Sequence, residues 1–146
     1  MTTRGSRLEE VHERRLRYDR VPLESGDALT SGDLIEVELK VTAKNDLDYL
    51  VFEDPKPAGC EPVELVSGAR FGELCSNMEL RDEKVAFFVT WLSRGEHLIR
   101  YRLRAEVPGT FHALPTRGWA MYAPEVRANA AEHLLGIDDR PDAPGR

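Results

Sequence analysis

The sequence lacks the patterns on which most enzymes and metal proteins depend. Its 146 residues include two cysteines and four histidines, and these show neither CxxC nor HxxxH spacing, which argues against a zinc site. There is no glycine-rich phosphate loop and no GxSxG nucleophile elbow. Cysteine–histidine dyads and carboxylate pairs such as Glu9-Glu10 can be drawn in almost any chain of this composition. We therefore predict a non-enzymatic protein without a metal or a cofactor.

Long hydrophobic runs are also missing. No stretch of about 18 apolar residues could cross a membrane, and Met1 to Ser6 lead into a charged segment instead of the apolar core of a signal peptide. This fits either a cytoplasmic protein or a piece of a longer exported chain. The net charge of −6 argues against a nucleic-acid-binding surface.

The two cysteines leave the redox compartment open. In an exported protein, Cys60 and Cys75 could close a loop with a disulfide that contributes about 3 kcal/mol. In a cytosolic protein both would be free thiols. The sequence favours neither interpretation.

Alternation of apolar and polar residues is the strongest structural signal that is present. Ile35 to Val41 and Tyr101 to Ala105 alternate with charged residues, as half-buried strands do. The segment from Tyr49 to Glu53 predicts a central strand, which Asp54 to Gly59 should break because prolines cannot donate to a strand ladder. Leu8 to Tyr18 has helix-favouring residues on one stripe and also alternates, and its charged character favours an edge strand over a helix.

Seven or eight short strands with Gly, Pro, Asn and Asp turns between them, and no long periodic helix, predict an antiparallel β-sandwich. We predict an N-terminal edge strand and turns over residues 1–33, the sandwich core over 34–127, and a short helix or disordered tail over 128–146. The short helix would lie within Pro124 to Leu135, with proline near its first turn. The polar tail from Asp138 to Arg146 has nothing to bury.

Two interpretations fit the aromatic segment near residue 120. Trp119 and Met121 could alternate into the core while Tyr122 faces outward and the strand seals the sheet. Alternatively, an exposed Tyr122 next to Met121, just before Pro124, could be a contact residue for another surface.

Three segments together carry a family resemblance. They are YLVFEDPKPAGCE (residues 49–61), VAFFVTWLSRGEHLIRYRLR (85–104) and the run with PGTFHALPTRGWAMYAPEVR (107–127). In order and spacing they resemble the C-terminal domain of bacterial α2-macroglobulin-like proteins. The matching motifs are Asp54-Pro55, Pro57-Ala58-Gly59, Arg100-Tyr101-Arg102, Pro108-Gly109-Thr110-Phe111 and Met121-Tyr122-Ala123-Pro124-Glu125.

The resemblance implies a macroglobulin-like β-sandwich from a larger periplasmic or extracellular protease inhibitor that traps proteases. It implies that Tyr122, with Met121 beside it, docks onto the thioester-containing region of the parent chain and shields that bond from water. The partners would be other domains of the parent chain and, through the full-length inhibitor, proteases. Neither nucleic acid nor a membrane is implied.

The chain departs from the family pattern in ways that keep a rival open. It has no Cys-Leu-Glu-Gln thioester motif and no bait region, so Tyr122 could be a docking residue without a bond to shield. The rival is a free-standing immunoglobulin- or fibronectin-like module that grips a protein partner by a sheet edge or loops. A small enzyme would need a deep pocket with converging titratable groups, which a sandwich of this size seldom has.

Overall fold

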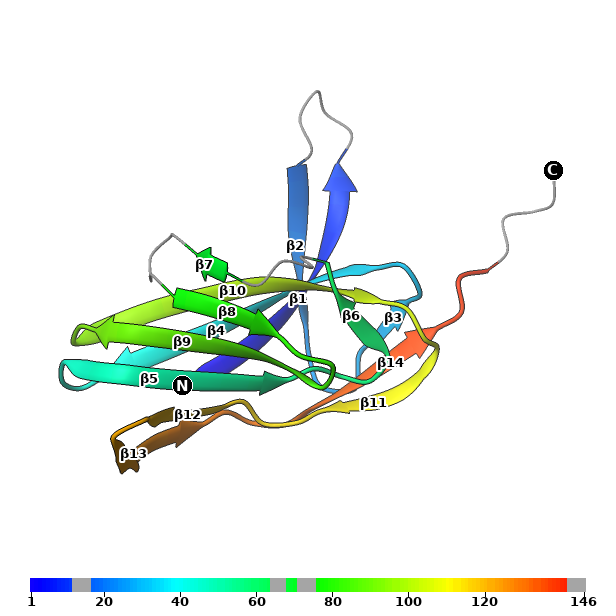
Figure 1. Ribbon diagram of the computed structural model, residues 1–146. Coiled ribbons are helices and arrows are strands. Elements are labelled where there is room, and N and C mark those ends of the chain that lie inside the picture. The colour runs from blue at the N-terminus through cyan, green and yellow to red at the C-terminus, as the bar shows by residue number, and fades with distance from the viewer. Residues whose placement is uncertain (12–16, 64–67, 71–75, 142–146) are drawn as a thin grey trace.

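The computed structural model describes residues 1–11, 17–63, 68–70 and 76–141. The regular structure in this part of the chain is entirely β and forms three sheets (Figure 1). The five-stranded sheet has the order β2 (Arg17–Leu23), β1 (Thr2–Val11), β4 (Leu34–Ala43), β10 (Gly95–Ala105) and β6 (Cys60–Pro62). The six-stranded sheet has the order β13 (Ala123–Asn129), β12 (Arg117–Ala120), β5 (Leu47–Pro55), β9 (Lys84–Leu92), β8 (Ser76–Leu80) and β7 (Gly68–Arg70). These assignments confirm the predicted all-β sandwich.

The pairing of β4 with β10 forms the centre of the five-stranded sheet. It is antiparallel, with Tyr101 opposite Val37, and both side chains are buried while Arg100 is exposed. Arg100 Nε donates to Glu38 Oε2 at 2.8 Å on the outer face. The alternation predicted for this strand is therefore confirmed, because one face of the sheet is packed and the other is solvated.

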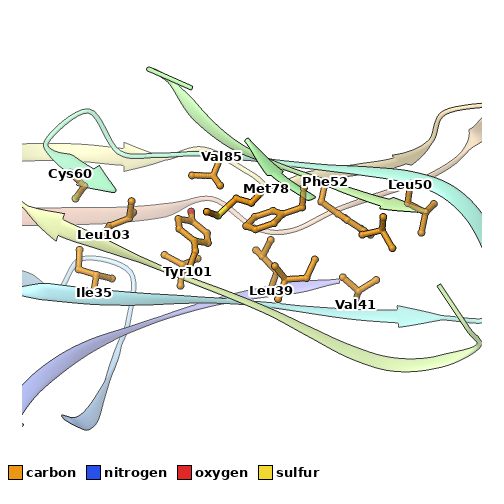
Figure 2. Packing of buried hydrophobic residues seen from close by; sticks show 14 of the residues in the cluster. Ile35, Leu39, Val41, Leu50, Phe52, Cys60, Met78, Val85, Tyr101 and Leu103 are labelled. Atoms are coloured by element: carbon orange, nitrogen blue, oxygen red, sulfur yellow. The ribbon is translucent and has the colours of Figure 1, made fainter. Parts of the chain in front are cut away.

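The hydrophobic core fills the space between the two large sheets. Figure 2 shows side chains from β4 and β10 meeting side chains from β5, β8 and β9. Phe87 in β9 is completely buried and its ring centroid lies 5.7 Å from that of Tyr101 in β10. The aromatic pair thus joins the two sheets at the middle of the sandwich.

A small third sheet closes one end of the sandwich. It has the order β11 (Gly109–Ala113), β14 (His133–Asp138) and β3 (Ala28–Thr30), and β14 pairs with β3 in parallel. Phe111 in β11 packs so closely on Gly59 that a Cβ there would lie 2.3 Å from the ring. The glycine of the Pro-Ala-Gly motif is therefore required by packing.

The predicted helix within Pro124 to Leu135 is wrong, because the structure has β13 and β14 in this segment. A two-residue turn folds β13 back along β12, with Arg117 opposite Asn129. Pro124 is tolerated because β13 is an edge strand of its sheet. Pairing with a strand already in place thus overrides the helix-favouring alanines of this segment.

The N-terminal strand prediction is correct in type and wrong in extent. Within the described residues the segment belongs to two paired strands, and β2 is the edge strand while β1 lies between β2 and β4. Residues 12–16, and residues 142–146 of the predicted tail, lie outside the described residues. The division at residues 33 and 127 stays a prediction, and strand pairing crosses both positions, since β1 pairs with β4 and β12 with β13.

Candidate docking site at the β12–β13 turn

Met121 and Tyr122 form the tight turn between β12 and β13, where Ala120 is paired with Ala123. Because the turn holds only these two residues, their side chains project from the end of the hairpin. Met121 is 47% exposed and Tyr122 is 79% exposed. Met121 therefore does not alternate into the core, and Tyr122 faces outward as both interpretations of the sequence required.

Tyr49, near the start of β5, lies directly beside this turn. Its carbonyl accepts a hydrogen bond from the Met121 backbone N–H at 2.8 Å. Its ring meets the Tyr122 ring edge to face, with centroids 5.4 Å apart and an interplanar angle of 86°. This is a favoured geometry for two aromatic rings, since the edge of one points at the face of the other.

The backbone of Tyr49 is in an unusual conformation. Its φ is 52°, and it is the one non-glycine residue with positive φ among the described residues. An aromatic residue in this left-handed region is strained, and such strain tends to persist where surrounding contacts enforce it. Sequence reasoning assigned no role to Tyr49, because φ leaves no mark in residue identity.

Exposed apolar side chains gather at this end of the six-stranded sheet. Trp91, near the end of β9, is 54% exposed and lies opposite Asp48, the residue before Tyr49. We call Tyr49, Trp91, Met121 and Tyr122 the aromatic patch. In Figure 1 the start of β5, the end of β9 and the β12–β13 turn lie at the same end of the sandwich. Exposed aromatic and Met side chains at one end of a sheet are typical of contact surfaces.

Trp119 does not enter the core as its alternation suggested. It is half-buried, whereas its neighbours Gly118 and Ala120 are buried. The Phe52 ring occupies the space beside Gly118, where a Cβ would lie 2.6 Å from Phe52 Cδ1. The inward positions of β12 are thus taken by small residues, and the tryptophan is placed on the other face of the strand.

A buried polar network links the two large sheets away from the patch. Asp54 in β5 accepts hydrogen bonds from the Tyr101 hydroxyl in β10 and from Thr116 Oγ1 at 2.7 Å. Thr116 Oγ1 also lies 2.8 Å from Thr3 Oγ1 in β1. Since the Thr116 hydroxyl donates to Asp54, Thr3 is the donor in this second bond. The network therefore ties β5 to β10 and β1 through side chains.

Burial perturbs both acidic groups of the network. It raises the pKa of Asp54 above its usual 3.8, and the hydrogen bonds from Tyr101 and Thr116 act in the opposite direction. The pKa of Tyr101 is raised well above 10.0 by burial and by the neighbouring Asp54. Beside the network lies a cavity of about 80 Å³, lined by Thr3, Leu23, Ile35, His133 and Leu135 among others. That volume holds water but is well below the several hundred Å³ of a usual ligand pocket.

Cys60 is buried at the start of β6 and has no disulfide partner among the described residues. Burial raises its pKa to about 12, so the reactive thiolate is scarce at neutral pH. Cys75 lies outside the described residues, and the Cys60–Cys75 disulfide stays a prediction.

Other kinds of site find no support in the described part of the chain. Within it, no group of three or more His, Cys, Asp or Glu side chains is placed to hold a metal ion. Nor do the described residues include a helix long and apolar enough to span a bilayer.

Comparison with known proteins agrees with this architecture. Residues 10–125 match the family described as the bacterial α2-macroglobulin MG10 domain. The curated α2-macroglobulin homologue of Nostoc is 26% identical over 77% of this chain, and the chain covers 6% of that protein. The α2-macroglobulin of Thermotoga maritima is 29% identical over 87% of this chain, which covers 9% of it. The chain thus spans less than a tenth of the length of either relative.

A solved structure gives the same fold. The crystal structure of Salmonella α2-macroglobulin reacted with methylamine aligns with 93% of this chain and shares 23% identity with it. The TM-score is 0.66 and the chain covers 9% of that protein.

Proposed function

This chain belongs to the bacterial α2-macroglobulin MG10 domain family, and from that membership we propose that it is a non-catalytic docking domain of an α2-macroglobulin-like protease inhibitor. In this proposal the aromatic patch seats on the thioester-containing region of the parent chain. Tyr122 is the central contact and Met121 lies beside it. The parent protein is periplasmic or extracellular and acts on proteases, while this domain holds the resting state together.

The exposure of Tyr122 carries the proposal. A tyrosine that is 79% exposed at the tip of a hairpin stabilises the isolated domain little, because surface side chains usually contribute within about 0.5 kcal/mol. The same side chain has a large apolar area to bury against a partner, and aromatic residues dominate the energetics of interfaces. The Met121 backbone hydrogen bond to Tyr49 anchors the turn to the six-stranded sheet, so little ordering is needed on docking.

The chemistry fits a shield for a hydrolysable bond. Met and Tyr side chains exclude water without offering a carboxylate or imidazole that could activate it. The titratable groups of the buried network lie in the sandwich interior, where Asp54 is only 5% exposed. The Tyr101 and Thr116 hydroxyls that donate to Asp54 hold the sheets together. The proposed role requires no catalytic group.

The coding sequence upstream of Met1 is the first test. The proposal expects an open reading frame that continues through further macroglobulin domains, a Cys-Leu-Glu-Gln motif and a signal peptide. A parent without a thioester motif would refute the shielding role, and a stop codon just before Met1 would favour the free-standing binding module.

The second test uses the parent protein with Tyr122→Ala and, as a control on the same hairpin, Glu125→Gln. Hydrolysis of the thioester releases a thiol, which is followed with a chromogenic disulfide reagent. We expect faster thiol release for Tyr122→Ala and an unchanged rate for Glu125→Gln. Equal rates in all three proteins would contradict the proposal.

A further inference from the structure

We propose that Tyr49 is a positioning residue that holds the Tyr122 ring in the orientation needed for docking; this inference rests on the function proposed above. Tyr122 sits at a hairpin tip and is 79% exposed, so few neighbours constrain its rotamer. An unsupported side chain spreads over three staggered χ1 wells. Shielding requires a single χ1 rotamer, because in the other two rotamers the ring would leave the bond exposed to water.

Tyr49 supplies the missing constraint by two separate contacts. Its carbonyl fixes the backbone of the turn through the Met121 N–H at 2.8 Å. Its ring fixes the side chain through the edge-to-face contact, with centroids 5.4 Å apart. The hydrogen bond fixes the position of the turn, and the ring contact fixes the orientation of the Tyr122 side chain. Both come from a single residue of the neighbouring strand.

The strained backbone of Tyr49 directs both groups toward the turn. A φ of 52° is common for glycine and asparagine and rare for an aromatic residue. Structure alone would favour glycine or asparagine at this position. A tyrosine here is accounted for if its ring is needed, and the residue is 48% exposed, so the core does not require it. Its ring contacts that of Tyr122.

The exposure of Tyr49 is confined to the start of β5. Leu50 and Phe52, which follow on β5, are buried in the core, whereas Asp48 and Tyr49 are both exposed. Because successive side chains of a strand point to opposite faces, the residue before the inward-facing Leu50 is directed away from the core. The Tyr49 ring is thus available to the aromatic patch and is not needed to fill the sandwich interior.

The test separates the ring from the backbone conformation with a matched pair of variants. Tyr49→Phe keeps the ring, and Tyr49→Asn tolerates positive φ without a ring. The 146-residue chain is labelled with ¹³C tyrosine, the Tyr122 signals are assigned from Tyr122→Phe, and the χ1 populations of Tyr122 are obtained from its Hα–Hβ couplings. We expect the unequal couplings of a single rotamer in the unaltered chain and in Tyr49→Phe. In Tyr49→Asn the couplings should average over three rotamers while urea denaturation still reports a folded domain.

Docking is then measured in the parent protein by thiol release. If Tyr122 spreads over three rotamers, its docking-competent fraction falls to about one third, so the undocked population rises about threefold. We expect thiol release about threefold faster for Tyr49→Asn and unchanged for Tyr49→Phe. Tyr122 Hα–Hβ couplings that are the same in Tyr49→Asn as in the unaltered chain would overturn the inference.

The two proposals fail in different ways. If Tyr122→Ala accelerates thiol release but Tyr49→Asn does not, the docking function stands and the positioning role of Tyr49 is wrong. If Tyr122→Ala has no effect on thiol release, the docking function is wrong, and the Tyr122 Hα–Hβ couplings decide separately whether Tyr49 orients that ring.

Discussion

Replacing Tyr101 with phenylalanine tests the buried polar network with a change of one oxygen atom. The Tyr101 ring lies between the sheets, 5.7 Å from the Phe87 ring, and Phe keeps its shape and packing. The hydroxyl that donates to Asp54 is lost. Asp54 retains the hydrogen bond from Thr116, but its other carboxylate oxygen loses its protein donor at a position that is only 5% exposed.

The size of the loss depends on the charge of Asp54. A hydrogen bond to an ionised group contributes about 1.5–3 kcal/mol, and one between neutral groups about 0.5–1.5 kcal/mol. Burial already raises the pKa of Asp54 in the folded protein. Removing a donor that favours the carboxylate raises this pKa further, so the folded variant binds a proton more tightly than the unaltered protein. The cost of Tyr101→Phe should therefore grow as the pH rises.

Urea denaturation followed by tryptophan fluorescence at pH 4, 6 and 8 measures this cost. We expect a loss of about 1 kcal/mol at pH 4 that rises toward about 2–3 kcal/mol at pH 8. In an Asp54→Asn background the cost of Tyr101→Phe should not grow with pH, because residue 54 no longer titrates. A loss that is the same at all three pH values, or one below about 0.5 kcal/mol, would refute a functioning Asp54–Tyr101 bond.

Three further predictions concern single sites. Gly118→Ala should cost about 1–3 kcal/mol of the free energy of unfolding, since its Cβ would lie 2.6 Å from Phe52 Cδ1, and an unchanged urea midpoint would contradict that packing. Tyr122→Ala should cost under about 1 kcal/mol in the isolated domain, and a loss of several kcal/mol would mean that the ring is part of the core. In a Cys75→Ala chain, Cys60, with its pKa raised to about 12, should react with a thiol reagent at pH 8 only when urea unfolds the domain. Rapid reaction of the folded chain would contradict its burial. If Cys60 and Cys75 form the predicted disulfide, the unaltered chain should show no free thiol in denaturant without reductant.

Alternation in the sequence predicted the strands in which burial of one face decides the residue types. From Leu34 to Ala43 and from Tyr101 to Ala105, one face packs in the core and the other carries polar and charged side chains. Residue type follows burial there except at Glu36, which is buried and paired with Arg20. The same principle failed at Trp119, because small residues and not large ones occupy the inward positions of β12. Periodicity alone cannot tell which of the two faces of a short strand is packed.

The candidate site was predictable only at its tip. Tyr122 and Met121 were found by the family resemblance, and the short segment before Pro124 suggested exposure. The sequence pattern places Tyr49 in a central strand, and nothing in residue identity marks a positive φ. Asp54 was assigned to a strand break because Pro55 follows it, yet β5 continues through Pro55 and Asp54 is buried. Both residues owe their roles to strands distant in sequence, which local patterns do not report.

The parallel pairing of β3 with β14 links completion of this domain to the direction of protein synthesis. The Leu134 N–H donates to Ser25 Oγ across 109 positions of the sequence, and Ile137 pairs with Leu29. The ribosome releases β3 well before its partner strand. Until β14 is made, Leu29, which is 1% exposed in the folded domain, lacks its strand partner Ile137. Pairing of such distant segments is slow, so a nascent chain arrested before His133 would present this apolar edge to chaperones.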